Sequence, residues 1–275
     1  MRLRLAVAFL AAAALVAFPA SSGGASPKIY LSLGDSLAAG YLSPEQPYSD
    51  QGYADQLLAL EKQTGRSLAL KKLGCPGETT TTMMQGGKCT YAKGSQLKQA
   101  VAYLKKYGKR IAFVTIDIGA NDMLPCLPTD ISCTSKALNT IETNFPKIIR
   151  QLRAAAGPTI KLQIVSMTYY APGLALWLTG AAGQAQATGY VKQFIAPLNE
   201  ILKSMYRGVK VKTADVAAAF SLTDFTTMTT LPGIGTVPIN VAKTCSLTSM
   251  CTRQDIHPTV AGYAVIAQAF AQVVK

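Results

Sequence analysis

The chain is poor in the residues that usually bind metals. His257 is the only histidine and Trp177 the only tryptophan among 275 residues, and 15% of the residues are charged. This composition excludes most multi-histidine metal sites, and neither the carboxylates nor the cysteines show the spacing of zinc ligands. The sequence also lacks the glycine-rich fingerprints of nucleotide sites, so we expect no metal and no cofactor. Any chemistry that needs an imidazole must use His257.

Acidic residues are also scarce. Lysine and arginine number 27 against 14 aspartates and glutamates, which gives a formal net charge of +13. The basic residues are scattered, and no basic stripe is interleaved with aromatics, so we expect no nucleic-acid partner. The hydrophobic share of 49% excludes a disordered chain, because it can bury a core that offsets the entropy lost on ordering.

The first 25 residues have the pattern of a secretory signal peptide. Two arginines precede an apolar run over residues 5–18, and small residues follow it. About 14 apolar residues fall short of the roughly 20 that cross a bilayer as a helix, which makes an uncleaved anchor the weaker alternative. We expect cleavage between residues 20 and 26 and a secreted protein, extracellular or cell-wall associated, without a stable membrane anchor. The mature chain is then a single domain over residues 26–275, which we expect to be a monomer.

The six cysteines become informative once export is expected. They fall into three pairs that are close in sequence, and in an oxidising compartment such pairs are typical of disulfides that pin loops. Six cysteines can pair in many ways, so nearest-neighbour pairing is a hypothesis. The expected pairs are Cys75 with Cys89, Cys126 with Cys133, and Cys245 with Cys251.

Short apolar runs alternate with longer helical patterns along the rest of the chain. This alternation predicts a mostly parallel sheet with helices on both faces, in a three-layer α/β/α sandwich. Pro146 and Pro197 are expected to kink or break their helices. The expected strands are 28–33, 68–73, 111–116, 161–167 and 209–213, and the expected helices are 53–64, 96–107, 134–156, 186–207 and 258–274.

Two segments do not fit this alternation. Residues 171–184 are rich in Ala, Gly and Leu and contain Trp177, and residues 221–250 are rich in Thr, Gly and Pro. Loops this long are unusual within one domain unless they are functional. Both are candidate walls of a substrate pocket, and for the second a plain surface excursion is an equal alternative. Trp177 either packs in the core or contacts a substrate.

Polar and glycine residues gather where the expected strands end. Binding sites of open parallel sheets lie outside the carboxyl ends of the strands, so we expect these residues to lie close together. The segments are Gly-Asp-Ser-Leu at 34–37, Gly-Cys-Pro-Gly-Glu-Thr at 74–79, Asp-Ile-Gly-Ala-Asn-Asp at 117–122 and, before the last helix, Asp-Ile-His-Pro at 255–258.

In this order, and across almost the whole mature chain, the four segments resemble the consensus blocks of the GDSL or SGNH hydrolase family of secreted esterases and lipases. The resemblance implies a flavodoxin-like α/β fold, and the cysteine pairs resemble those of disulfide-containing members. The nucleophile block corresponds to Gly34-Asp35-Ser36-Leu37 with Gly40, the second block to Gly77, the third to Gly119-Ala-Asn121-Asp122 and the last to His257-Pro258.

The resemblance implies a carboxylic ester hydrolase acting on a small-molecule or lipid ester. Ser36 is then the nucleophile and His257 the base that activates it. The main-chain N–H groups of Ser36 and Gly77 and the side-chain amide of Asn121 are then the oxyanion hole. Losing one such donor typically costs about 10²- to 10³-fold in rate.

One position departs from the family pattern. The family usually has its acidic residue three positions before the histidine, and here that position is Gln254. Asp255 lies two positions before His257, so either its carboxylate orients the imidazole or a main-chain carbonyl, such as that of Gln254, accepts the Nδ1 proton. The carboxylate is the favoured choice, because a charged partner stabilises the imidazolium better.

The sequence leaves alternatives to the hydrolysis of acyl esters open. One is removal of O-acetyl groups from a polysaccharide, another is a non-catalytic cell-surface binding module, and a third is a glycosidase that uses Asp117 and Asp122 as its carboxylate pair. No amphipathic lid helix is visible, which favours an esterase over an interfacially activated lipase.

Overall fold

The computed structural model describes residues 26–126 and 130–274, and the expected signal peptide lies outside these residues. Its parallel strands are β1 (Lys28–Gly34), β2 (Leu68–Lys72), β3 (Ile111–Asp117), β4 (Ile164–Met167) and β5 (Lys212–Ala214), and a hairpin follows with β6 (Met228–Leu231) and β7 (Gly235–Pro238). The helices are α1 (Ser36–Ala39), α2 (Tyr53–Gln63), α3 (Thr80–Gln85), α4 (Gln96–Tyr107), α5 (Ala120–Met123), α6 (Ile131–Ala156), α7 (Ala181–Gly189), α8 (Ala196–Gly208), α9 (Val216–Ala219), α10 (Ile239–Leu247), α11 (Met250–Arg253) and α12 (Val260–Ala271), with the 3-10 helices η1 (Gly108–Arg110) and η2 (Pro172–Thr179) and the π-helix η3 (Tyr190–Ile195).

The central sheet has five parallel strands in the order β2-β1-β3-β4-β5. This is the flavodoxin-like order: β2 and β3 lie on opposite sides of β1, so the strand order reverses there and leaves a crevice at the carboxyl ends of β1 and β3. From Tyr30 onward the two strands stay in register to their carboxyl ends, where Gly34 pairs with Asp117. The loops that carry Ser36 and Asn121 therefore start side by side.

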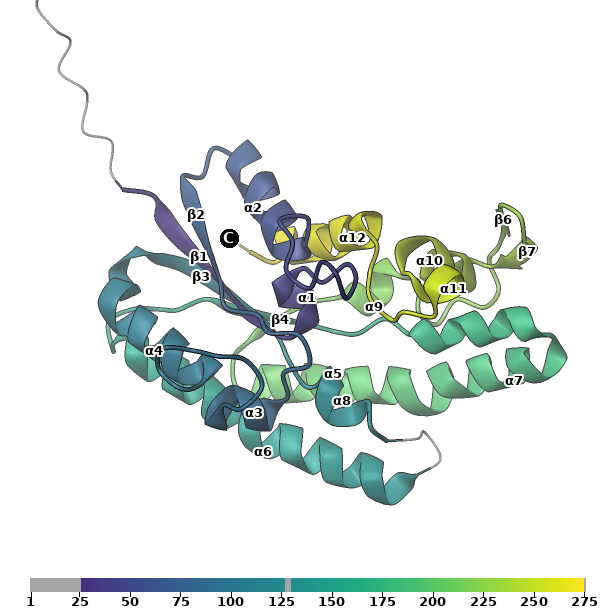
Figure 1. The fold of residues 1–275 in the computed structure, drawn as a ribbon, viewed down its shortest axis with the longest axis horizontal. Helices are drawn as coiled ribbons and strands as arrows, with labels where there is room; N and C mark the ends of the chain where they lie inside the picture. Colours follow the sequence, from purple (N-terminus) through teal and green to yellow (C-terminus); the bar gives the residue numbers. More distant parts are fainter. Residues whose placement is uncertain (1–25, 127–129, 275) are drawn as a thin grey trace, which may run out of the picture.

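Helices cover both faces of the sheet, which confirms the three-layer α/β/α prediction. Helices α2 and α12 lie on one face, and α4, α6 and α8 lie on the other (Figure 1). The sequence dictates this arrangement through its periodicity. In α6, Ile141, Phe145, Ile148 and Leu152 recur at intervals of three and four residues, and all are at most 1% exposed.

A kink or a break was expected at Pro146 and Pro197, and neither proline ends its helical segment. Helix α6 runs unbroken with Pro146 inside it, because its apolar face packs on the core on both sides of the proline. The chain is also helical from α7 through η3 to α8. Pro197 is the second residue of α8 and directly follows the π-helical turns of η3.

The two segments expected to be loops contain regular structure. Residues 171–184 form η2 and the start of α7, and residues 221–250 contain the β6–β7 hairpin and α10. They fold because their apolar residues build a second core cluster, which includes Leu174, Leu222 and Val241. Trp177 packs on Phe225 there, with ring centroids 5.8 Å apart.

Three disulfides pin connections between elements. They join Cys75 to Cys89, Cys126 to Cys133 and Cys245 to Cys251, as the sequence proximity suggested. Within the described part of the chain, none of the helices has both the length and the apolarity needed to cross a membrane.

Candidate active site

Ser36 sits on a tight turn between β1 and α1. Asp35 caps α1 by accepting a hydrogen bond from the N–H of Leu37 at 3.0 Å, and Ser36 begins the helix. Gly34 has a φ of 137°, and a side chain there would collide with the main chain and carboxyl group of Asp117. Glycine is therefore required two residues before Ser36 for both conformation and space.

Asp117, at the end of β3, fixes the main chain of the turn that carries Ser36. One carboxylate oxygen accepts the N–H groups of Asp35 and Ala38 at 3.3 and 3.2 Å, and the other accepts the Tyr53 hydroxyl at 2.5 Å. Burial raises the pKa of Asp117 well above its usual range, and the neighbouring Asp35 raises it further. These contacts make Asp35 and Asp117 structural supports of the turn, which also argues against Asp117 as half of a glycosidase pair.

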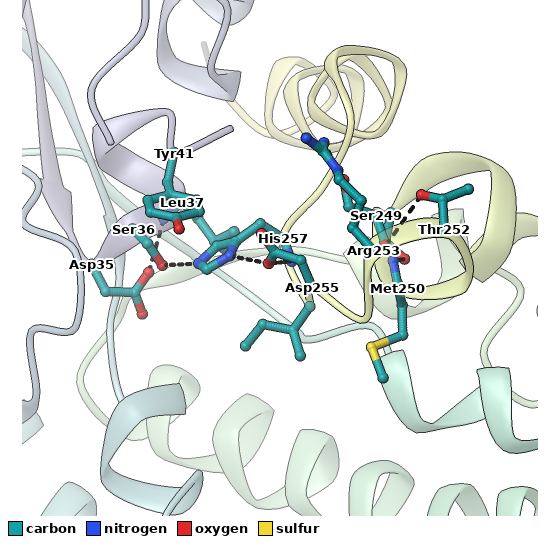
Figure 2. Close-up of polar contacts among 12 residues, drawn as sticks. Asp35, Ser36, Leu37, Tyr41, Ser249, Met250, Thr252, Arg253, Asp255 and His257 are labelled. Atoms are coloured by element: carbon teal, nitrogen blue, oxygen red, sulfur yellow. Dashed lines mark hydrogen bonds and ion pairs between the residues drawn. The ribbon is translucent and has the colours of Figure 1, made fainter. Parts of the chain in front are cut away.

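His257 lies between Ser36 and Asp255 (Figure 2). Its Nε2 is 2.9 Å from Ser36 Oγ, and its Nδ1 is 2.5 Å from Asp255 Oδ1. The same carboxylate oxygen accepts the main-chain N–H of His257 at 3.0 Å. Asp255 reaches the ring from only two positions away because its side chain folds back over its own turn. Among the described residues the carboxylate, and not the Gln254 carbonyl, partners Nδ1.

The segment before α12 is held by several independent contacts. Ser249 donates its N–H to the His257 carbonyl at 2.9 Å, and the Tyr170 hydroxyl donates to the Ile256 carbonyl at 2.8 Å. The disulfide Cys245–Cys251 closes the preceding helices α10 and α11 on each other. The histidine loop is thus tied to α11, to the end of β4 and to the second core cluster.

Tyr41 is a further residue at the site, and our sequence analysis did not identify it. Its ring centroid lies 4.0 Å from that of the His257 imidazole, with 34° between the ring planes. Gly40 ends α1 in a left-handed conformation, and the reversed chain brings the Tyr41 N–H to the Ser36 carbonyl at 3.0 Å. The Tyr263 hydroxyl fixes the Tyr41 carbonyl at 2.8 Å. A glycine that closes a helix four residues after the nucleophile was the available signal.

The other two expected oxyanion-hole residues follow β2 and β3. Gly77 has a φ of 77°, which favours glycine, and it stands in the turn before α3. Asn121 lies in the first turn of α5 and donates one amide hydrogen to the Glu78 carbonyl at 3.0 Å, which leaves its second amide hydrogen for a ligand. Asp122 accepts the N–H and the hydroxyl of Thr80 at 2.8 and 2.6 Å, so it also binds α5 to the segment that carries Gly77.

An apolar pocket opens beside these groups and encloses about 240 Å³. Ser36, Asn121 and His257 form its polar end. Its walls include Met123 and Leu124 at the end of α5 and, from η3 and α8, Tyr190, Phe194, Ile195 and Leu198. Burial raises the pKa of Tyr190 to about 12, so this wall stays uncharged at neutral pH. The pocket suits an apolar chain attached to a carbonyl group at Ser36.

No group of three or more His, Cys, Asp or Glu side chains within residues 26–126 and 130–274 is placed to hold a metal ion. The polar end of the pocket offers the Ser36 hydroxyl, the His257 imidazole and the Asn121 amide.

The chain matches the GDSL-like Lipase/Acylhydrolase family over residues 32–265. No protein with a curated description matches it. Its fold is similar to that of solved structures at 16–17% sequence identity: the lipase Lip_vut3 from a goat rumen metagenome (16% identity, TM-score 0.56, covering 89% of this chain and 96% of that one), a lipase/acylhydrolase from Enterococcus faecalis (17%, 0.51, 89% and 94%) and Axe2, an acetylxylan esterase from Geobacillus stearothermophilus (16%, 0.53, 90% and 94%).

Proposed function

The chain belongs to the GDSL-like lipase/acylhydrolase family and is a carboxylic ester hydrolase, and from this premise we propose that it cleaves short- to medium-chain acyl esters or lipids through an acyl-enzyme on Ser36. The observation that carries this proposal is the position of Ser36, hydrogen-bonded to His257 at the polar end of an apolar pocket.

In the first step the Ser36 hydroxyl attacks the ester carbonyl, and its proton passes to His257 Nε2. Asp255, on Nδ1, stabilises the imidazolium that forms. The negative charge on the former carbonyl oxygen is stabilised by the N–H groups of Ser36 and Gly77 and by the Asn121 amide. Collapse of this intermediate breaks the ester bond, and His257 returns the proton to the departing alcohol.

In the second step water hydrolyses the acyl-enzyme. His257 removes a proton from the water, the resulting hydroxide attacks the Ser36 ester, and the acid leaves as Ser36 recovers its proton. Both steps need a base, and His257 serves in both because the sequence contains a single histidine.

The pocket favours an acyl chain over an acetyl group. A cavity of about 240 Å³ is many times the roughly 10–15 Å³ that one water molecule needs. An acetyl group would leave most of this apolar volume unfilled, which disfavours an O-acetyl-polysaccharide deacetylase. We further propose that the protein is secreted, because the three disulfides fit an oxidising compartment and residues 1–25 have the pattern of a signal peptide.

The test uses the purified, oxidised mature protein with p-nitrophenyl esters from acetate to palmitate, beside Ser36→Ala. We expect an optimum at acyl chains longer than acetate, because the apolar pocket extends beyond Ser36, and we expect hydrolysis to be lost in the variant. An optimum at acetate, extended by activity on acetylated xylan, would favour the deacetylase. Absence of hydrolysis with every ester and with acetylated glycans would favour a binding module.

A further inference from the structure

A buried glutamine connects the nucleophile strand to the neighbouring loop. Gln96, in the first turn of α4, is fully buried. Its Oε1 accepts the N–H of Gly34 at 2.7 Å, and its Nε2 donates to the Gly34 carbonyl at 2.9 Å. Both polar groups of the residue two positions before Ser36 are therefore fixed by one side chain.

The same amide reaches the loop that carries Gly77. Gln96 Nε2 donates to Glu78 Oε2 at 3.0 Å and also lies 3.0 Å from the Tyr91 hydroxyl, which donates to the Leu73 carbonyl. Glu78 is 1% exposed and directly follows Gly77. Its carbonyl accepts the Asn121 amide. Glu78 is thus linked to all three expected oxyanion donors: it follows Gly77 in the chain, it bonds Asn121, and it reaches the strand of Ser36 through Gln96.

We propose that Gln96 and Glu78 form a clamp that sets the spacing of the oxyanion hole. The inference rests on the function proposed above, in which Ser36, Gly77 and Asn121 supply the hole. Gln96 and Glu78 are positioning residues: neither contacts the substrate, and they act through the main chain of Gly34 and of the turn at Gly77.

The need for a clamp follows from the chain path. The donors come from the ends of three different strands, and a main-chain bond from the Cys75 N–H to the Gly34 carbonyl, 3.1 Å long, joins two of these segments before Gly77 is reached. The Gln96–Glu78 contact joins them again just beyond Gly77. Fixing the turn on both sides of the glycine prevents it from rotating its N–H away from the developing charge.

The test compares two substitutions of Glu78 that differ in one property. Glu78→Gln keeps a carbonyl oxygen that accepts from Gln96, and Glu78→Met keeps the length and removes the acceptor. We expect Glu78→Gln to retain kcat, and Glu78→Met to lose about 10- to 100-fold in kcat at little change in KM. Gln96→Met removes the clamp from the other side, and we expect the same pattern.

A matched control separates positioning from loss of stability. Asn240 is also fully buried and donates to a main-chain carbonyl, that of Leu222, but it lies in α10 within the second core cluster. Asn240→Leu is expected to lower the melting temperature to a similar extent and to leave kcat unchanged. Loss of kcat in this control equal to that in Glu78→Met would overturn the clamp.

The labelling of Ser36 by an alkyl fluorophosphonate distinguishes failure of the clamp from failure of the proposed function. In this reaction Ser36 Oγ bonds to phosphorus and fluoride leaves, while negative charge builds on the phosphoryl oxygen. We expect labelling of the wild type at Ser36 and slower labelling in Glu78→Met. No labelling of the wild type would refute the proposed function. Labelling and turnover of folded Glu78→Met and Gln96→Met at wild-type rates would refute the clamp alone.

Discussion

The two sides of the active site are built in different ways. On the reaction side, Ser36 and Asn121 follow β1 and β3 within a few residues. Buried hydrogen bonds to Asp117 and Gln96 fix the main chain beside Ser36, and the Asn121 amide donates to the Glu78 carbonyl. On the pocket side, the wall comes from η3 and α8, which belong to the long excursion after β4, and apolar packing holds it. We therefore expect substitutions on the reaction side to change the rate with every ester, and those on the pocket side to change which ester is preferred.

The largest effect is expected from Asp255→Asn. The substitution keeps the shape of the side chain and removes the charge that stabilises the His257 imidazolium. We expect kcat to fall by about 10³- to 10⁴-fold, by analogy with triad aspartates. Asp224, which lies outside the pocket and accepts hydrogen bonds from the Thr226 and Thr227 N–H groups at 3.0 and 2.8 Å, supplies the control Asp224→Asn. A loss below about tenfold in steady-state assays would mean that the carboxylate is not needed on Nδ1.

A substitution in the pocket wall tests the other half of the comparison. Phe194→Ala lengthens the pocket between η3 and α5, so the preferred ester should gain carbons. We expect the ratio of kcat/KM between decanoate and butanoate esters to rise by about tenfold or more, because one methylene in an apolar pocket is worth 10- to 200-fold. The control is Phe225→Ala, since Phe225 is also half-buried but packs on Trp177 outside the pocket. An unchanged ratio in Phe194→Ala would place the acyl chain elsewhere.

The sequence predicted the reaction side better than the pocket side. Short apolar runs located all five strands, although β5 forms at Lys212–Ala214 and the prediction placed it at 209–213. The short motifs that resemble the family's blocks named Ser36, Asn121 and His257. Structure in residues 171–184 and 221–250 was missed, since those segments fold by packing on each other rather than by their own periodicity. Tyr41 and Gln96 were missed for a related reason. Their contacts with His257 and Gly34 are made across the fold. For Tyr41 the neighbouring Gly40, which ends α1, was a local signal, and Gln96 had none.

Tyr41 should have a smaller effect, again on rate rather than on preference. Its ring against the imidazole stabilises the positively charged form that arises during attack, a contact worth about 0.5–1 kcal/mol at an exposed site. We expect Tyr41→Leu to lose about two- to fivefold in kcat with every ester, while Tyr41→Phe, which keeps the ring, stays near the wild type. Equal losses in both variants would instead assign the effect to the hydroxyl.

The smallest effect concerns stability and its dependence on pH. Burial raises the pKa of Glu78, so the folded state binds this proton more tightly than the unfolded chain does. The stabilisation is present below the unfolded value of about 4.3 and is lost as pH rises through the folded pKa. Glu78→Gln cannot titrate. In urea melts we expect it to match the wild type at pH 4 and to be the more stable of the two proteins at pH 8. A wild type that is the more stable protein at pH 8 would show that the ionised carboxylate is stabilised instead.

The central claim is that Ser36 carries the acyl group, and mass spectrometry of the acid-quenched reaction tests it most directly. The oxidised protein is mixed with excess p-nitrophenyl butanoate, quenched in acid within the first turnovers and digested. We predict a butanoyl mass increment on the peptide that contains Ser36, together with its absence in Ser36→Ala. An increment on another residue, or undiminished turnover by Ser36→Ala, would contradict the account.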